Sequence, residues 1–98
     1  LVSNRIEFSY QLYCALHFMI DYPTPISKTI SDSLHRIFNN SAQPLYNRCC
    51  AARLLLVENK NNHSLLKGAM ESSDDALFKK EMRVILEREL PASRVFNP

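Results

Sequence analysis

The chain has 98 residues and a formal net charge of +2, and 46% of its residues are apolar. A chain of this length buries one modest core, so we expect residues 1–98 to form a single helical domain or a fragment of a longer helical-repeat protein. Because Leu1 stands where an initiator methionine would, we expect an excised fragment or a processed product. Average apolar and charged usage disfavours disorder, and the thin basic excess disfavours nucleic acid as a partner.

Three further features narrow the class of protein. The only glycine is Gly68, whereas hairpin turns rely on glycine for positive φ, so an all-β fold is disfavoured. The longest strongly apolar run, residues 12–20, is far shorter than the about 20 residues that cross a bilayer, so no membrane span is expected. Three cysteines form an odd count, which argues against a disulfide framework and for an intracellular location, cytoplasmic or nuclear.

The first two helices are predicted from apolar spacing. The first covers about residues 4–21, and its second half is apolar nearly all round, which is typical of a helix enclosed by neighbours on several sides. Thr24 and Pro25 match an N-cap followed by proline at the first helical position. A second, amphipathic helix is therefore predicted over about residues 25–38, and the turn-forming residues 39–41 end it.

The middle of the chain predicts a third and a fourth helix. The third begins at Pro44 and carries apolar residues on two adjoining faces, which indicates a central position. The fourth is short, over about residues 63–71. It contains Gly68, which costs roughly 1 kcal/mol relative to alanine inside a helix.

The last helix is predicted over about residues 74–90. Serine and aspartate at 72–75 supply hydroxyl and carboxylate caps at its positively charged end. Pro91 is predicted to end it, and residues 91–98 to form a tail or linker. The elements together predict an all-α fold of about five helices arranged as antiparallel pairs.

One pattern occurs twice, as Ala-Arg-Leu-Leu-Leu at 52–56 and as Met-Arg-Val-Ile-Leu at 82–86. A helix is predicted between the copies, so the period spans a helix pair, as in stacked helical repeats. Residues 44–90 resemble HEAT-type α-solenoid repeats, in which a first helix carries a basic residue followed by small and aliphatic positions, as residues 48–55 do. The resemblance implies a right-handed stack of helix pairs. The alternative is a compact five-helix bundle, since Met82 replaces the small residue of the family pattern.

The candidate chemistry is sparse. Cys14, His17 and Asp21 share one predicted helix face and could offer three metal ligands or a Cys–His pair. No Cys-x-x-Cys or His-x-x-x-His pair accompanies them, so we interpret Cys14 as a core cysteine and His17 as partly buried. Cys49 and Cys50 diverge by about 100° on a helix and are interpreted as small packing residues. We expect no catalytic residue, metal, cofactor or enzymatic activity.

Aromatic residues lie at core spacings, so they are expected in the interior rather than on a base-stacking surface. The set consists of four tyrosines together with Phe8, Phe18, Phe38 and Phe78.

A periodic apolar pattern without catalytic signatures predicts a non-enzymatic helical scaffold that binds another protein or the remainder of its own chain. No pattern specifies an oligomeric state. The alternative is a helical nucleic-acid-binding domain, although the helix after Pro44 is too apolar to lie in a DNA groove. The predicted partner contacts are basic residues that repeat stacking would expose: Arg48, Arg53, Lys79, Lys80 and Arg83.

Overall fold

In the part of the chain that the computed structural model describes, every regular element is an α-helix. The backbone is described for residues 2–23 and 25–96, and side chains for 9–23 and 25–87. The helices are α1 (Val2–Asp21), α2 (Lys28–Asn39), α3 (Leu45–Glu58), α4 (Asn62–Ser72) and α5 (Ala76–Phe96). No strand occurs within these ranges, which confirms the predicted all-α class.

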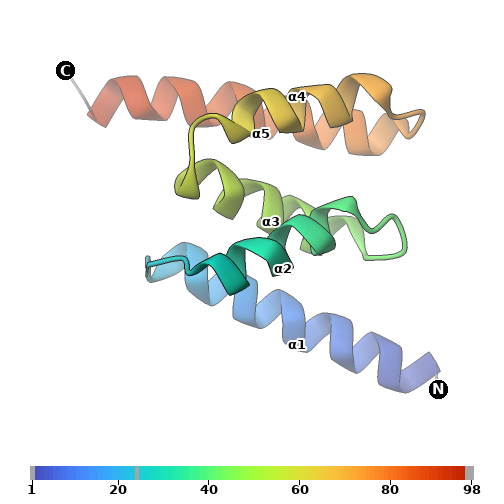
Figure 1. The fold of residues 1–98 in the computed structure, drawn as a ribbon. Coiled ribbons are helices and arrows are strands. Elements are labelled where there is room, and N and C mark those ends of the chain that lie inside the picture. Colours follow the sequence, from blue (N-terminus) through green and yellow to red (C-terminus); the bar gives the residue numbers. More distant parts are fainter. Residues whose placement is uncertain (1, 24, 97–98) are drawn as a thin grey trace.

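Helix α3 is the centre of the fold. It packs against each of the other four helices, and the most extensive packing joins it to α2 and then to α1. In Figure 1, α1, α3 and α5 run in one direction while α2 and α4 run back in front of them, so successive helices are antiparallel. The predicted antiparallel pairs and the central position of α3 are confirmed. Membership of the HEAT family stays a prediction.

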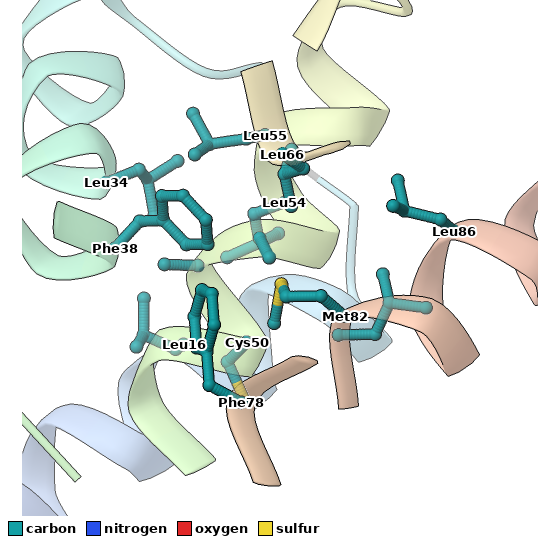
Figure 2. Packing of buried hydrophobic residues seen from close by; sticks show 13 residues of the cluster. Leu16, Leu34, Phe38, Cys50, Leu54, Leu55, Leu66, Phe78, Met82 and Leu86 are labelled. Carbon is teal, nitrogen blue, oxygen red and sulfur yellow. The ribbon is translucent and has the colours of Figure 1, made fainter. Parts of the chain in front are cut away.

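The core lies between α3 and its neighbours (Figure 2). Phe38 of α2 and Phe78 of α5 pack against each other, with ring centroids 5.9 Å apart. On α3, Ala51 and Ala52 are completely buried. Because these residues are small, the neighbouring helices can approach α3 closely. The largest side chains that are almost fully enclosed are Phe38, Phe78, Leu34, Leu55, Leu66 and Met82.

The two copies of the repeated pattern, 52–56 in α3 and 82–86 in α5, occupy similar environments. In both copies the first and fourth residues are buried and the arginine is exposed. The third residue is also buried in α3, whereas in α5 the fifth residue is buried instead. The copies therefore agree at the first, second and fourth positions and differ at the third and fifth, of which α3 buries the third and α5 the fifth.

Helix α2 begins later than predicted. Its N-cap is Ser27, whose Oγ accepts a hydrogen bond from the backbone N–H of Ile30 at 3.2 Å. A serine in this position satisfies one of the unpaired N–H groups at a helix start. The prediction that Pro25 is the first helical residue is wrong, because Pro25 precedes the helix. Thr24 lies outside the described residues.

The start of α5 agrees with the predicted carboxylate cap. The Asp75 Oδ1 atom accepts hydrogen bonds from the N–H groups of Leu77 at 3.0 Å and Phe78 at 3.2 Å. The Ser73 hydroxyl accepts another from the Asp75 N–H at 3.1 Å. Together these bonds fix the turn between α4 and α5, and they aim Phe78 toward the core.

The end of α5 differs from the prediction. The helix continues through Pro91 to Phe96, so the prediction that Pro91 ends it is wrong. A proline inside a helix removes one N–H···O hydrogen bond, but its φ near −65° is itself helical, which lets the backbone continue. Asn97 and Pro98 lie outside the described residues, and the role of 91–98 as a tail or linker stays a prediction.

Helix α1 is placed differently from the expectation that several neighbours enclose it. Among the described residues it packs against α3, at the edge of the helix array. One side, including Leu16, is buried, whereas Phe18 and Tyr22 on the other side are exposed. The prediction of enclosure on several sides is therefore wrong for this chain.

Candidate interaction surface

A row of large side chains lies on the outer side of α1. Tyr10, Phe18 and Tyr22 are 62%, 60% and 62% exposed, respectively. With Cys14, which is also exposed, they recur every four residues and so follow one face of α1, with Tyr22 directly after the end of the helix. We refer to Tyr10, Cys14, Phe18 and Tyr22 as the aromatic face. It points away from the side of α1 that carries the buried Leu16.

Ring contacts hold the aromatic side chains in place. Phe18 and Tyr22 pack with ring centroids 4.7 Å apart. Beside the aromatic face, Tyr13 meets Tyr46 of α3 edge-on at 5.2 Å and lies 5.4 Å from the ring of His17. The Tyr13–Tyr46 contact ties α1 to α3. The surface is thus partly organised before any partner arrives, which lowers the entropy lost on binding.

Cys14, His17 and Asp21 line an open depression beside the aromatic face. His17 Nδ1 lies 3.2 Å from Asp21 Oδ2, and both side chains are solvent-accessible. Cys14 is exposed, so its interpretation as a core cysteine is wrong. Within the side chains that the structure describes, no group of three or more His, Cys, Asp or Glu residues is placed to hold a metal ion.

The described aromatic side chains range from buried to exposed, with Tyr13 half-buried. Phe38 and Phe78 are buried as predicted, but the prediction of an interior position is wrong for the exposed set Tyr10, Phe18, Tyr22 and Tyr46. The side chain of Phe8 lies outside the described residues. The four-residue spacing of the aromatic face was visible in the sequence, yet an apolar stripe is usually covered by its own chain, and the spacing does not say whether a cover exists.

Arg48 holds a different position from the other predicted contact residues. Its Nε donates a hydrogen bond to the Phe38 carbonyl at 2.9 Å, and its guanidinium carbon lies 4.3 Å from the centroid of the Phe78 ring. Phe38 lies in the last turn of α2, where unpaired carbonyls favour a cation. Arg48 therefore joins α2, α3 and α5, and the geometry gives it a structural role.

The remaining basic candidates lie on two helices and do not form one patch with Arg48. On α5, Lys80 and Arg83 are exposed and Lys79 is half-buried. Glu87, four residues after Arg83, shares that helix face and is also exposed, so the surface of α5 has mixed charge. Arg53 on α3 is exposed and lies beside the end of α1.

Arg53 borders a small cavity between the end of α1, the segment after it and the end of α3. The cavity has a volume of about 150 Å³. Among the described lining residues, Leu54 alone is buried. The other residues around it are Met19, Ile20, Pro23, Ile26, Arg53 and Val57.

The adjacent cysteines of α3 are poorly suited to thiol chemistry. Burial, assisted by the Glu81 carboxylate and by Cys50, raises the pKa of Cys49 to about 11. Burial also raises the pKa of Cys50. Since the thiolate is the nucleophile and the metal ligand, both effects disfavour reaction at neutral pH. This agrees with their interpretation as packing residues.

Comparisons with known proteins give no match: neither a family model, nor a curated protein, nor a solved structure is significantly similar to the chain. Within its described part, the chain has no helix with the length and hydropathy required to span a bilayer.

Proposed function

We propose that this protein is a non-enzymatic helical scaffold whose aromatic face binds a helix of another protein. The observation that carries the proposal is the joint exposure of Tyr10, Phe18 and Tyr22 on the side of α1 that the described residues leave uncovered. Contiguous exposed apolar surface of this kind marks interaction sites in soluble proteins. Tyrosine and phenylalanine are enriched there because they bury a large area with few rotatable bonds.

The shape of the surface favours a helical partner. Tyr10 to Tyr22 covers about three turns, or roughly 18 Å at 1.5 Å per residue, along a straight ridge. On its inner side, α1 already packs lengthwise against another helix, α3. A helix aligned with the outer ridge would pack by the same ridge-and-groove geometry. Its contact residues would be apolar side chains at i, i+3 or i+4, and i+7.

The charge of the surface favours a protein over a nucleic acid. Residues 9–22 contain neither lysine nor arginine, and Asp21 is their one acidic residue. The aromatic face therefore has no cation to contact phosphate, whereas phosphate contacts dominate nucleic-acid affinity. A basic residue at the end of the partner helix would complement Asp21.

Site-specific photo-crosslinking tests this proposal. A photoreactive phenylalanine analogue is placed at Phe18, and in a control variant at Leu77, an exposed apolar residue at the start of α5. We expect the Phe18 variant alone to capture a protein, and mass spectrometry to place the attachment in an amphipathic helix of that protein. Equal capture by both variants, capture of nucleic acid, or capture of a second copy of this chain would each overturn the proposal.

The captured partner then permits a quantitative test. Replacing Phe18 with glutamate puts a charge in the middle of the ridge, and loss of a central aromatic contact weakens binding by roughly 30-fold. The Leu77→Glu variant should bind as the unmodified protein does. Titration by fluorescence anisotropy measures both, and circular dichroism checks that both variants remain helical.

A further inference from the structure

The cavity beside Arg53 has the size of one side chain. Its volume is about 150 Å³, whereas sites for cofactors and drug-sized ligands occupy roughly 300–1,000 Å³. An engineered apolar protein cavity of about 150 Å³ holds one benzene molecule. A ligand of this cavity can therefore place one medium-sized apolar group inside and must make its other contacts outside, as a peptide does.

The lining of the cavity specifies the chemistry of that group. Leu54 is the buried lining residue, and the side chains of Met19, Ile20 and Ile26 around it are aliphatic or thioether. These residues offer no side-chain hydrogen-bond donor or acceptor other than the weak thioether sulfur, so they favour an aliphatic side chain.

The charge at the cavity is positive. Arg53 is the one charged residue among the described residues of the lining. A guanidinium carries five N–H donors in a fixed fork, so it can bind a carboxylate with two parallel hydrogen bonds while some donors serve other partners. An aliphatic group accompanied by a carboxylate is complementary to both parts of the site.

We infer that this cavity binds the C-terminal residue of a partner protein, with an aliphatic side chain such as leucine inside and the terminal carboxylate on Arg53. A C-terminal residue carries both groups on one α-carbon, which suits a site that admits one side chain and offers one cation. The cavity shares no residue with the aromatic face. The inference therefore adds a second contact to the proposed scaffold and can fail or succeed independently of it.

A matched pair of small probes tests the inference on the full chain. N-acetyl-L-leucine has the side chain and the carboxylate, and N-acetyl-L-leucinamide has the same shape without the charge. In titrations followed by backbone amide NMR shifts, we expect the acid to perturb residues around Arg53, Leu54 and Ile26. We expect it to bind about fivefold more tightly than the amide, as one partly exposed ion pair permits. Equal affinities would overturn the inference.

Two variants separate charge recognition from damage to the fold. Arg53→Gln should remove the difference between the probes, while Lys80→Gln on α5 should preserve it. Val57 is 69% exposed, so Val57→Glu leaves the core intact and should weaken the acid selectively by charge repulsion. If Val57→Glu binds both probes as the unmodified protein does, the cavity is not the binding site.

A third probe distinguishes a C-terminus from an internal acidic residue. In N-acetyl-Leu-Asp-amide the carboxylate lies on the residue after leucine. Weaker binding than that of N-acetyl-L-leucine supports the C-terminal assignment. Tighter binding would overturn it in favour of an acidic segment within a chain. Phe18→Glu should leave the affinities for all three probes unchanged. A failure of the aromatic-face proposal can therefore be distinguished from a failure of the cavity inference.

Discussion

Helices α1 and α3 are both rich in apolar residues, but they differ in how far other helices cover them. Each carries apolar residues around most of its circumference over the described side chains. Around α3, the other four helices cover most of those residues, so that Ala51, Ala52 and Leu55 are fully enclosed, while Tyr46 and Val57 stay exposed. Around α1, the cover stops at α3, and Phe18 and Tyr22 face solvent.

The comparison shows what apolar periodicity can and cannot specify. A helix that is apolar around its circumference is stable only where neighbours remove that surface from water. The apolar pattern does not specify whether those neighbours belong to the same chain. For α3 they do, and for the outer side of α1 the described chain supplies none. The uncovered side is therefore the natural place for a partner.

The largest expected effect contrasts the two environments directly. Leu55→Ala removes a fully enclosed side chain, and such truncations cost about 2–5 kcal/mol because a cavity remains. Phe18→Ala removes a larger side chain that is mostly exposed, so its effect should stay within about 0.5 kcal/mol. Urea unfolding followed by circular dichroism gives both free energies.

The outcome of that pair bears on the placement of α1. A loss of 2 kcal/mol or more for Phe18→Ala, on the scale of core truncations, would mean that Phe18 is enclosed in the free protein. The aromatic face would then be part of the core, and the proposed helix-binding role would have no surface to act through.

A smaller loss of stability is expected from a substitution at Arg48, the cation that packs between α2, α3 and α5. Arg48→Met keeps much of the apolar stem but removes the hydrogen bond to Phe38 and the stacking on Phe78. A hydrogen bond of this kind contributes about 0.5–1.5 kcal/mol and a cation–π contact about 0.5–2 kcal/mol, so we expect a loss of about 1–3 kcal/mol.

Arg83→Met is the matched control for that measurement, because Arg83 is exposed on α5. It should change the free energy of unfolding by less than about 0.5 kcal/mol. If the two substitutions have the same effect, Arg48 does not join the three helices, and it returns to the set of surface residues available to a partner.

The reactivity of the cysteines should show the same difference in exposure between α1 and α3. Cys14 is exposed on α1, whereas Cys50 is buried and burial raises the pKa of Cys49 to about 11. With iodoacetamide at pH 8, Cys14 in the folded protein should react at least about tenfold faster than the other two. Raising the pH toward 10 should accelerate Cys49, because its thiolate fraction increases as the pH approaches the pKa.

Peptide mass spectrometry assigns the rate to each thiol, and the reaction in urea is the control. Unfolding removes the burial that protects Cys49 and Cys50, so the three rates should converge. Equal rates in the folded protein would contradict the difference in exposure between α1 and α3.

Local chemistry made most of the fold predictable, and its failures have physical causes. Helix periodicity gave the five helices, and Pro44 and Asp75 marked two starts closely. Ser27 rather than Pro25 begins α2, because a hydroxyl that accepts a backbone hydrogen bond fixes the start more firmly than a proline does. Pro91 does not end α5, since proline's φ is compatible with a helix.

The candidate sites were less predictable than the fold, because exposure is a property of the assembled helices. The sequence placed both Arg48 and Arg53 among the predicted partner contacts. Packing separates them, since Arg48 stacks on Phe78 and Arg53 borders the cavity at the end of α1. Likewise, the aromatic spacing of α1 was visible, but only the packing shows which side α3 covers.

The smallest expected change in stability is a gain rather than a loss. It depends on the helix propensity of the backbone and not on burial of a side chain. A β-carbon added at Gly68 of α4 would meet no heavy atom within 4 Å, and positive φ is absent from the described residues. Gly68→Ala should therefore stabilise the protein by about 0.5–1 kcal/mol, through helix propensity alone. The melting temperature should rise by about 2–8 °C for a domain of this size.

Ala51→Gly provides the reverse change where the methyl group is fully enclosed. It loses both the propensity and the buried contact, so its cost should exceed the gain at Gly68 by the value of one buried methyl group, about 0.8 kcal/mol. Equal and opposite effects would mean that enclosure around α3 contributes nothing at that position. The contrast between the covered centre and the uncovered edge would then have to rest on the large side chains alone.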